Sequence, residues 1–324
     1  MKLPVYAHPT LTVLVSGASS PLQGWAAGMA PRRSLKTFQN AHQALEWLLH
    51  CPPHAGVPLH VNYDLPSCSV TVDVENIVNI SRQRERFATP SVLVVDFYLP
   101  GMNGLDVCRA LQNLPCKKIL LAGENEERIA IDALNNGLID RYVRKQDSAA
   151  PAQLADQIAA LQQSWFLEQE RTAGELLALH DFSFLRSPRM AEEVQRLYRE
   201  QDFIEHYVFP QPGGLLLIDQ AGRQQLMVVE TEAGMQTHYE VARDSGAPRP
   251  LLQALAERRV LPLFTHAGRD SMYDKEVGGQ WQRYCRAPRV CHDRDTYYWA
   301  LFDLPPSFLR EQPYTHAQYL RDAA

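Results

Sequence analysis

The sequence predicts an α/β fold in which a doubly wound parallel sheet forms the N-terminal part and an α+β domain follows. Two observations carry this prediction. Between residues 91 and 143, continuous apolar strands alternate with amphipathic helices, which is typical of a parallel sheet covered on both faces. After residue 210, short strands follow one another across glycine-containing turns. At 324 residues, the chain is long enough to bury two cores.

The elements of the first part follow from their hydrophobic periods. An apolar strand at 11–15 runs into the loop Ser16-Gly17, and the proline-rich stretch 51–70 indicates an insertion. Strands are expected at 11–15, 34–38, 92–95, 118–121 and 140–143, and helices at 41–49, 73–87, 105–114 and 126–136. We therefore predict an N-terminal domain over residues 1–148, with an insertion at about 51–90.

The second part begins with a predicted long helix over residues 151–178, which is either a packed connector or a dimerising helix. Ser187-Pro188 predicts another helix start, with Ser as the cap. Further strands are expected at 214–219, 225–230, 238–242, 260–264 and 297–301, and a helix at 250–259. The predicted organisation is a helical connector at 149–180 and an α+β domain at 181–324.

Composition narrows the functional class. A net charge of −5 gives no general reason to expect nucleic-acid binding. The sequence has neither an apolar run of about 18 residues that would span a membrane nor the layout of a signal peptide. Its six cysteines form no C-x-x-C pair, and Cys285 beside Cys291-His292 is too little to assign a metal. These features predict a protein of the reducing cytoplasm.

The chemistry is expected at Asp96. This residue closes the buried strand 92–95, and Lys145 follows the last parallel strand, so both should lie at the same rim of the sheet. A carboxylate fixed there can act as a nucleophile toward phosphorus. The product carries about −1.5 to −2 charges, for which Lys145 would be the cationic partner. The turn from Pro100 to Gly104 would lie beneath the phosphoryl group.

The stretch 92–105, Val-Leu-Val-Val-Asp-Phe-Tyr-Leu-Pro-Gly-Met-Asn-Gly-Leu, resembles the signature of response-regulator receiver domains. The resemblance covers about residues 10–148 and implies a flavodoxin-like fold. It implies Asp96 as the phosphoacceptor, Lys145 as the phosphate-sensing lysine and Tyr142 as the switch aromatic, with Pro100 and Gly104 at the family's spacing. Residues 117–123 and 136–142 further resemble the α-hydroxyketone quorum-sensing response regulators, and residues 206–232 resemble the output domain of that group.

The chain departs from the receiver pattern at three positions. Receivers hold Mg²⁺ with an acidic pair after the first strand, and here Ser16-Gly17 stands there. Asp96 then remains as a Mg²⁺ ligand, and Asp64, Asp73 or Glu75 of the insertion could take the place of the missing acidic pair. The switch hydroxyl is replaced by Ala122, and the proline after the lysine by Gln146. Because Mg²⁺ neutralises charge in phosphoryl transfer, the first departure bears on phosphorylation itself.

The predicted function is that of a response regulator in a two-component phosphorelay. If the helix at 151–178 is a dimerising helix and not a connector, the partner is a second copy of the chain. A sensor histidine kinase or phosphotransfer protein would modify Asp96. The output would be non-enzymatic, since no metal or nucleotide motif follows residue 180. The alternative is a phosphate-independent pseudo-receiver that acts as a protein-interaction scaffold.

A basic and aromatic stretch leaves nucleic acid open as a partner. Its residues are Trp281, Arg283, Tyr284, Arg286, Arg289 and Arg294. Acidic residues are interspersed at Asp270, Asp274, Glu276, Asp293 and Asp295. This mixture favours a solvated, salt-bridged surface, and no helix-turn-helix pattern accompanies it.

Overall fold

The computed structural model describes residues 2–29, 34–52, 54, 56, 60–64, 69–179, 182–263, 280–305, 308–309 and 311–322; at 60–64, 69–73 and 75 it describes the backbone alone. The chain divides into two compact units. The parallel-sheet unit comprises residues 8–56, 84–169 and 319–324. The antiparallel-sheet unit comprises residues 1–7, 57–83 and 170–318.

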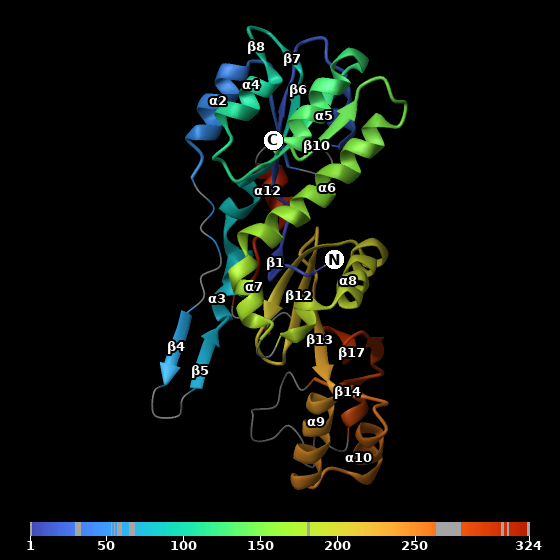
Figure 1. Ribbon diagram of the computed structural model, residues 1–324. Coiled ribbons are helices and arrows are strands. Elements are labelled where there is room, and N and C mark those ends of the chain that lie inside the picture. The colour runs from blue at the N-terminus through green and yellow to red at the C-terminus, as the bar shows by residue number, and fades with distance from the viewer. Residues whose placement is uncertain are drawn as a thin grey trace. The chain divides into compact units, whose positions relative to one another are not determined.

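The parallel-sheet unit has five strands in the order β10-β9-β6-β2-β3, all paired in parallel (Figure 1). In chain order this is the 2-1-3-4-5 arrangement of flavodoxin-like folds. The strands are β2 (Leu11–Val15), β3 (Leu35–Phe38), β6 (Pro90–Asp96), β9 (Lys117–Ala122) and β10 (Arg141–Arg144). The helices are α1 (Leu22–Met29), α2 (Ala41–Leu49), α4 (Gly104–Ala110), α5 (Glu127–Asn135) and α6 (Ala150–Gln169), with the 3-10 turns η3 (Arg84–Ala88) and η4 (Glu124–Glu126).

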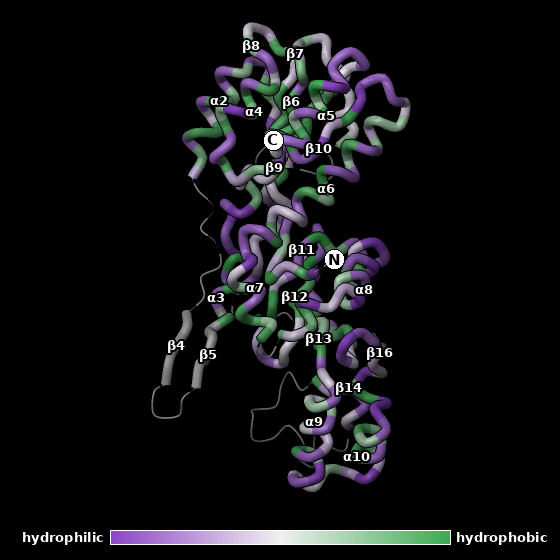
Figure 2. The backbone as a smooth tube through the Cα atoms, viewed as in Figure 1, coloured by the Kyte–Doolittle hydropathy of each residue, from purple (hydrophilic) through white to green (hydrophobic). Residues whose placement is uncertain are grey.

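Helices cover both faces of this sheet. One apolar core includes side chains of α2, α4 and α5, and the other includes side chains of α1 and α6. Every residue of β2 is buried, and so are the last six of β6, because a central parallel strand has no solvent face. Figure 2 shows the hydrophobic colour along β6. The predicted doubly wound α/β fold is confirmed.

The antiparallel-sheet unit contains a six-stranded sheet in the order β1-β11-β12-β13-β17-β16. Its strands are β1 (Tyr6–Ala7), β11 (Phe203–Phe209), β12 (Gly214–Asp219), β13 (Gln224–Thr231), β16 (Arg289–His292) and β17 (Thr296–Asp303). Smaller pairs are β4 (His60–Asp64) with β5 (Ser69–Asp73), and β14 (Leu261–Pro262) with β15 (Cys285–Arg286). Its helical segments are α3 (Glu75–Asn79), η2 (Ile80–Arg82), α7 (Arg171–Leu177), η5 (Ser183–Arg186), α8 (Pro188–Gln201), α9 (Glu232–Asp244), α10 (Arg249–Ala256) and η7 (Trp281–Arg283). A last helix, α12 (His316–Asp322), crosses the boundary between the units in sequence.

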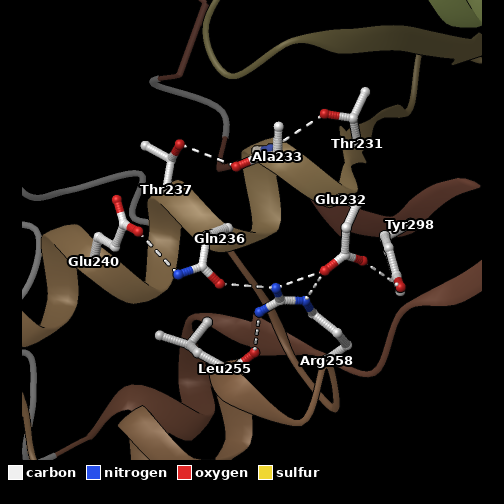
Figure 3. A network of polar contacts seen from close by, with 10 residues as sticks. Thr231, Glu232, Ala233, Gln236, Thr237, Glu240, Leu255, Arg258 and Tyr298 are labelled. Carbon is white, nitrogen blue, oxygen red and sulfur yellow. Dashed lines mark hydrogen bonds and ion pairs between the residues drawn. The ribbon is translucent and has the colours of Figure 1, made fainter.

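A polar network ties α9 to the end of α10 (Figure 3). Arg258 follows α10 in a left-handed conformation, with φ of 57°, which usually favours glycine. Its guanidinium donates to Glu232 Oε1 through Nη2 at 2.7 Å and to Leu255 O through Nη1 at 3.0 Å. Glu232 Oε2 accepts a further bond from the Tyr298 hydroxyl of β17 at 2.8 Å. The strained residue therefore connects two helices and the sheet.

Three sequence predictions are wrong in detail, and a fourth holds only in part. The helix expected at 73–87 is three short segments, α3, η2 and η3. The strand expected at 238–242 lies inside α9, which Thr231 caps by accepting a bond from Gly234 N. The single helix expected at 151–178 is broken at Glu170, between α6 and α7. The buried Glu170 carboxylate accepts hydrogen bonds from Val5 N and Tyr6 N. Of the strand expected at 260–264, residues 261–262 form β14, and Phe264 lies outside the described residues.

Candidate functional site

Asp96 is the last residue of β6, the middle strand of the parallel sheet. Its side chain is 1% exposed, and its backbone is paired with Leu121 of β9. Phe97 N continues this pairing by donating to Leu121 O at 2.9 Å. The strand order reverses between β2 and β6, and ligands of such sheets bind where the order reverses, at the carboxyl ends of the strands. The fold therefore fixes the Asp96 carboxylate at the rim where a reactive group is expected.

Lys145 reaches Asp96 from two strands away. It follows β10, and its backbone N–H donates to Ala122 O at 3.0 Å. Its Nζ lies 2.8 Å from Asp96 Oδ1, and its side chain is 20% exposed. Thus the structure brings together the two residues on which the sequence analysis based the site.

The Asp96 carboxylate is poorly solvated. Although Lys145 forms the ion pair with Oδ1, this buried atom accepts no bond of hydrogen-bonding geometry from the described residues. Buried polar atoms without a hydrogen bond are rare in folded proteins, so each of them calls for an explanation. A carboxylate oxygen with spare acceptor capacity beside one cation suits a nucleophile whose product is a bulkier anion.

The loop after Asp96 forms a tight hairpin between β7 (Tyr98–Leu99) and β8 (Met102–Asn103). Pro100 and Gly101 make its turn, and Gly101 has a φ of +75°, which glycine adopts without strain. Gly104 is needed for another reason. A Cβ at that position would lie 2.1 Å from Asp96 O, and Gly104 N donates to Phe97 O at 2.8 Å. The Pro100–Gly104 segment therefore packs backbone against backbone beside Asp96.

The two residues at the predicted switch positions lie on the same side of the sheet. Ala122 is the fully buried last residue of β9, and the half-buried Tyr142 packs against the core cluster that contains it. The Tyr142 hydroxyl donates to Glu127 Oε1 of α5 at 3.3 Å, and Arg144 also pairs with Glu127. Tyr142 is thus tethered to the start of α5.

The described residues do not build a Mg²⁺ site of the usual acidic kind. Mg²⁺ prefers oxygen ligands, typically one or two carboxylates with water. The loop after β2 offers Ser16 and Gly17, and no group of three or more His, Cys, Asp or Glu suited to a metal occurs among the described residues. The side chains of Asp64, Asp73 and Glu75, named as possible substitutes, lie outside what the structure describes. We therefore derive no chemical step through a metal.

Sequence reasoning missed Glu126, which lies at the same rim. Its carboxylate is buried, with 6% of the residue exposed. Oε2 accepts from Gly123 N at 2.8 Å, and Oε1 accepts from the Tyr98 hydroxyl at 2.9 Å. Through this bond, Glu126 raises the pKa of the Tyr98 phenol. The available signal was a Glu three residues after a helix-capping position, the second half of a capping box.

The basic and aromatic stretch near the C-terminus has a mixed surface. Arg283, Arg286, Arg289 and Arg294 are exposed. Arg286 and Arg289 lie over the rings of Phe302 and Trp299, while Asp293 accepts a bond from Ser187. Asp270, Asp274 and Glu276 lie outside the described residues. Cys285 and Cys291 are buried, and burial raises the pKa of both thiols, which keeps them in the protonated form.

None of the described helices combines the length and the hydrophobicity that crossing a membrane requires. No protein-family model matches the sequence. No curated protein matches it either.

Among solved structures, the response regulator LqsR of Legionella pneumophila is similar along the whole chain. The match covers 100% of this chain and 98% of LqsR, with a TM-score of 0.77 and 24% sequence identity. Two shorter matches are an adenylate cyclase from Rhodopirellula baltica and a CheY-like receiver-domain protein from Methanospirillum hungatei. The cyclase has a TM-score of 0.35 and 18% identity, covering 53% of this chain and 98% of that one. The receiver-domain protein has a TM-score of 0.34 and 15% identity, and the match covers 49% of this chain and 98% of that one.

The likeness to LqsR establishes the fold of both parts of the chain, a receiver-type parallel sheet with a C-terminal α+β domain. The resemblance to response regulators found in the sequence is thus confirmed for the fold. With TM-scores this low, the two shorter matches do not bear on function.

Proposed function

We propose that this protein is a response regulator of a two-component phosphorelay that accepts a phosphoryl group on Asp96. The single observation that carries the proposal is the ion pair between the buried Asp96 carboxylate and Lys145, 2.8 Å apart at the carboxyl end of the parallel sheet. The fold shared with the LqsR response regulator supports it. The sequence resemblance in residues 117–123 and 136–142 supports a role in quorum sensing.

The proposed transfer uses one carboxylate oxygen of Asp96. This oxygen attacks the phosphorus of a phosphohistidine on a sensor kinase or phosphotransfer protein. An O–P bond forms, the donor's P–N bond breaks, and the electron pair stays on the imidazole nitrogen, which takes a proton from water. Lys145 then neutralises part of the charge on the aspartyl phosphate, and its link to Ala122 O passes the change to β9 and β10.

The antiparallel-sheet unit, together with the elements the sequence assigned to a connector at 149–180 and a domain at 181–324, would be the output. We propose that this output is non-enzymatic and works in the cytoplasm through a partner or a second copy of the chain. The domain boundaries are part of the proposal, since the compact units divide at residue 170, inside the predicted connector.

A second function is favoured by one observation, the absence of a carboxylate at Ser16-Gly17. A pseudo-receiver would keep the fold and bind partners without phosphorylation. The two functions differ in a direct measurement. Incubation with acetyl phosphate and Mg²⁺ should add one phosphoryl group to the intact mass of the wild type and none to Asp96→Asn.

Asp106→Asn is the matched control, because Asp106 is an exposed carboxylate on α4 that, among the described residues, pairs with its helical neighbour Arg109. It should take the label like the wild type. If the mass of the wild type stays unmodified both with acetyl phosphate and with a cognate kinase, the proposed function is refuted and the pseudo-receiver function is supported.

A further inference from the structure

Two loops leave the parallel sheet beside Asp96, and Glu126 joins them. Tyr98 lies two residues beyond Asp96, and Gly123 lies two residues beyond Leu121, the strand partner of Asp96. The Glu126 carboxylate accepts from the Tyr98 hydroxyl at 2.9 Å and from Gly123 N at 2.8 Å. One carboxylate therefore spans the rim from the Asp96 loop to the neighbouring loop.

Helix capping explains only half of this arrangement. A Glu at the third position of a helical turn commonly accepts from the N–H of the capping residue, here Gly123. Tyr98 belongs to a different loop and contributes nothing to the cap. The Glu126 side chain is also buried, whereas Glu124 and Asn125 of the same turn are exposed. Burying a carboxylate costs free energy that its hydrogen bonds must offset, so the bridge to Tyr98 needs an explanation of its own.

The explanation follows from the charge that Asp96 would acquire. A phosphoryl group at this rim brings about two negative charges and needs hydrogen-bond donors. Gly123 N–H is the first amide of the β9 chain beyond the strand, and the Glu126 carboxylate already holds it. Asp96 and Glu126 are both buried, and two anions at the same rim repel each other. Phosphorylation and the Glu126 bridge are therefore in competition.

Glu126 is also next to the residue that holds the predicted switch aromatic. α5 begins at Glu127, whose carboxylate accepts from the Tyr142 hydroxyl at 3.3 Å and pairs with Arg144. Movement of the turn that carries Glu126 would therefore move the acceptor of Tyr142. Because Ala122 has no hydroxyl to bind a phosphate, a route through the Glu126 turn can take its place.

We propose that Glu126 is an internal anion that guards the site: it binds Tyr98 and Gly123 in the unmodified protein and leaves them when Asp96 is phosphorylated. Its departure shifts the start of α5 and, through Glu127, Tyr142. This inference rests on the proposed function and adds the regulation of the same site. Glu126 acts here as a positioning residue, since it does not take the phosphoryl group.

The first test removes only the charge. Glu126→Gln keeps the shape and one acceptor oxygen. Binding of beryllofluoride, a phosphoryl mimic, is measured by fluorine NMR in the presence of Mg²⁺. We expect at least about tenfold tighter binding than in the wild type, which corresponds to about 1.4 kcal/mol. Glu124→Gln changes an exposed Glu of the same turn and should stay within about twofold of the wild type, as surface substitutions usually do.

A second variant covers the case in which Glu126→Gln does not fold. Tyr98→Phe removes the hydroxyl, which is one of the two donors to the Glu126 carboxylate. The Tyr98 side chain is 66% exposed, so the fold should tolerate the change, and beryllofluoride binding should tighten as well. The bridge itself has an independent readout. Glu126→Gln should lower the pKa of the Tyr98 phenol, followed as the one tyrosine transition in the ultraviolet titration that is lost in Tyr98→Phe.

The outcomes separate the two hypotheses. A wild type that binds the mimic while Glu126→Gln and Tyr98→Phe bind it no better would overturn the role of Glu126 and leave the proposed function standing. If neither the wild type nor any variant binds beryllofluoride or takes the label, the proposed function fails and this inference fails with it. Binding gained only in the Glu126→Gln protein would support the guarding role.

Discussion

Gly104→Ala should damage the site by steric overlap alone. The new Cβ would lie 2.1 Å from Asp96 O, and real Cβ atoms essentially never approach closer than 3.0 Å. The two backbone segments must therefore separate by about 0.9 Å. That shift would stretch the 2.8 Å bond from Gly104 N to Phe97 O beyond hydrogen-bonding range.

Two costs follow from this separation. Overpacking a buried position costs about 1–3 kcal/mol, and a buried amide that loses its acceptor costs about 1–3 kcal/mol. We expect the free energy of unfolding of the parallel-sheet unit to fall by about 3 kcal/mol. Because Asp96 belongs to one of the two segments that separate, its displacement is up to about 0.9 Å, and its phosphorylation rate should fall by up to about a hundredfold.

Hydrogen exchange of peptides from β6 and α4 measures the local stability, and intact mass against time with acetyl phosphate measures the rate. Gly24→Ala in α1 is the matched control, since a Cβ there meets nothing within 4 Å. Alanine in a helix should stabilise by about 1 kcal/mol and leave the rate unchanged. If Gly104→Ala is as stable and as reactive as the wild type, the close approach of the two backbones has no part in building the site.

Three further changes test other parts of the account. Lys145→Ala should leave the labelling of Asp96 partly intact but abolish its effect on oligomeric state by light scattering; a response like that of the wild type would deny the lysine a signalling role. Ala122→Thr should lower basal dimerisation, because the larger side chain leaves Tyr142 less room to sit inward without phosphate. Its hydroxyl should also restore a hydrogen bond to the phosphate worth about 1.5–3 kcal/mol, and so widen the response by up to about a hundredfold. Unchanged basal and stimulated dimer fractions would remove Ala122 from the switch. Gly17→Asp should raise the affinity for Mg²⁺ at least about tenfold by isothermal calorimetry, because a Cβ there meets Pro100 at an ordinary 3.8 Å and the new side chain adds a carboxylate after β2, where Ser16 and Gly17 offer none; unchanged affinity would contradict this.

The parallel sheet could be predicted from the sequence because its strands are buried on both faces. Continuous apolar runs such as 92–95 are then unambiguous when helices separate them. The same regularity placed Asp96 and Lys145 at one rim, since the carboxyl ends of parallel strands share an edge. Topology thus predicts that the two residues lie at one rim, while the 2.8 Å distance between Lys145 Nζ and Asp96 Oδ1 depends on their side-chain positions.

Elements outside this pattern were less predictable. Residues 238–242 alternate like a strand, but Thr231 caps a helix that begins six residues earlier, at Glu232. β1 pairs with β11 through Tyr6 and Tyr207, and no local period reveals a partner so far along the chain. The helix break at Glu170 depends on the same part of the chain, because the carboxylate accepts from the amides of Val5 and Tyr6 at the start of β1. These features depend on long-range contacts.

The site itself was predicted only in part for the same reason. Gly104 fits a turn signal in the sequence, while its actual requirement is the approach to Asp96 O. Glu126 gave a capping signal, and its bond to Tyr98 depends on how two loops meet above the sheet. Sequence patterns locate the strand ends, whereas the contacts between the loops that follow them appear only in three dimensions.

The central claim is that Asp96 is the phosphoacceptor, and one chemical measurement tests it directly. Borohydride reduces an acyl phosphate to an alcohol and releases phosphate, so a phosphorylated aspartate becomes homoserine. After incubation with acetyl phosphate and Mg²⁺, reduction and proteolysis, peptide mass spectrometry should find homoserine at position 96. Homoserine at another aspartate, or at none while a cognate kinase is present, would contradict the account.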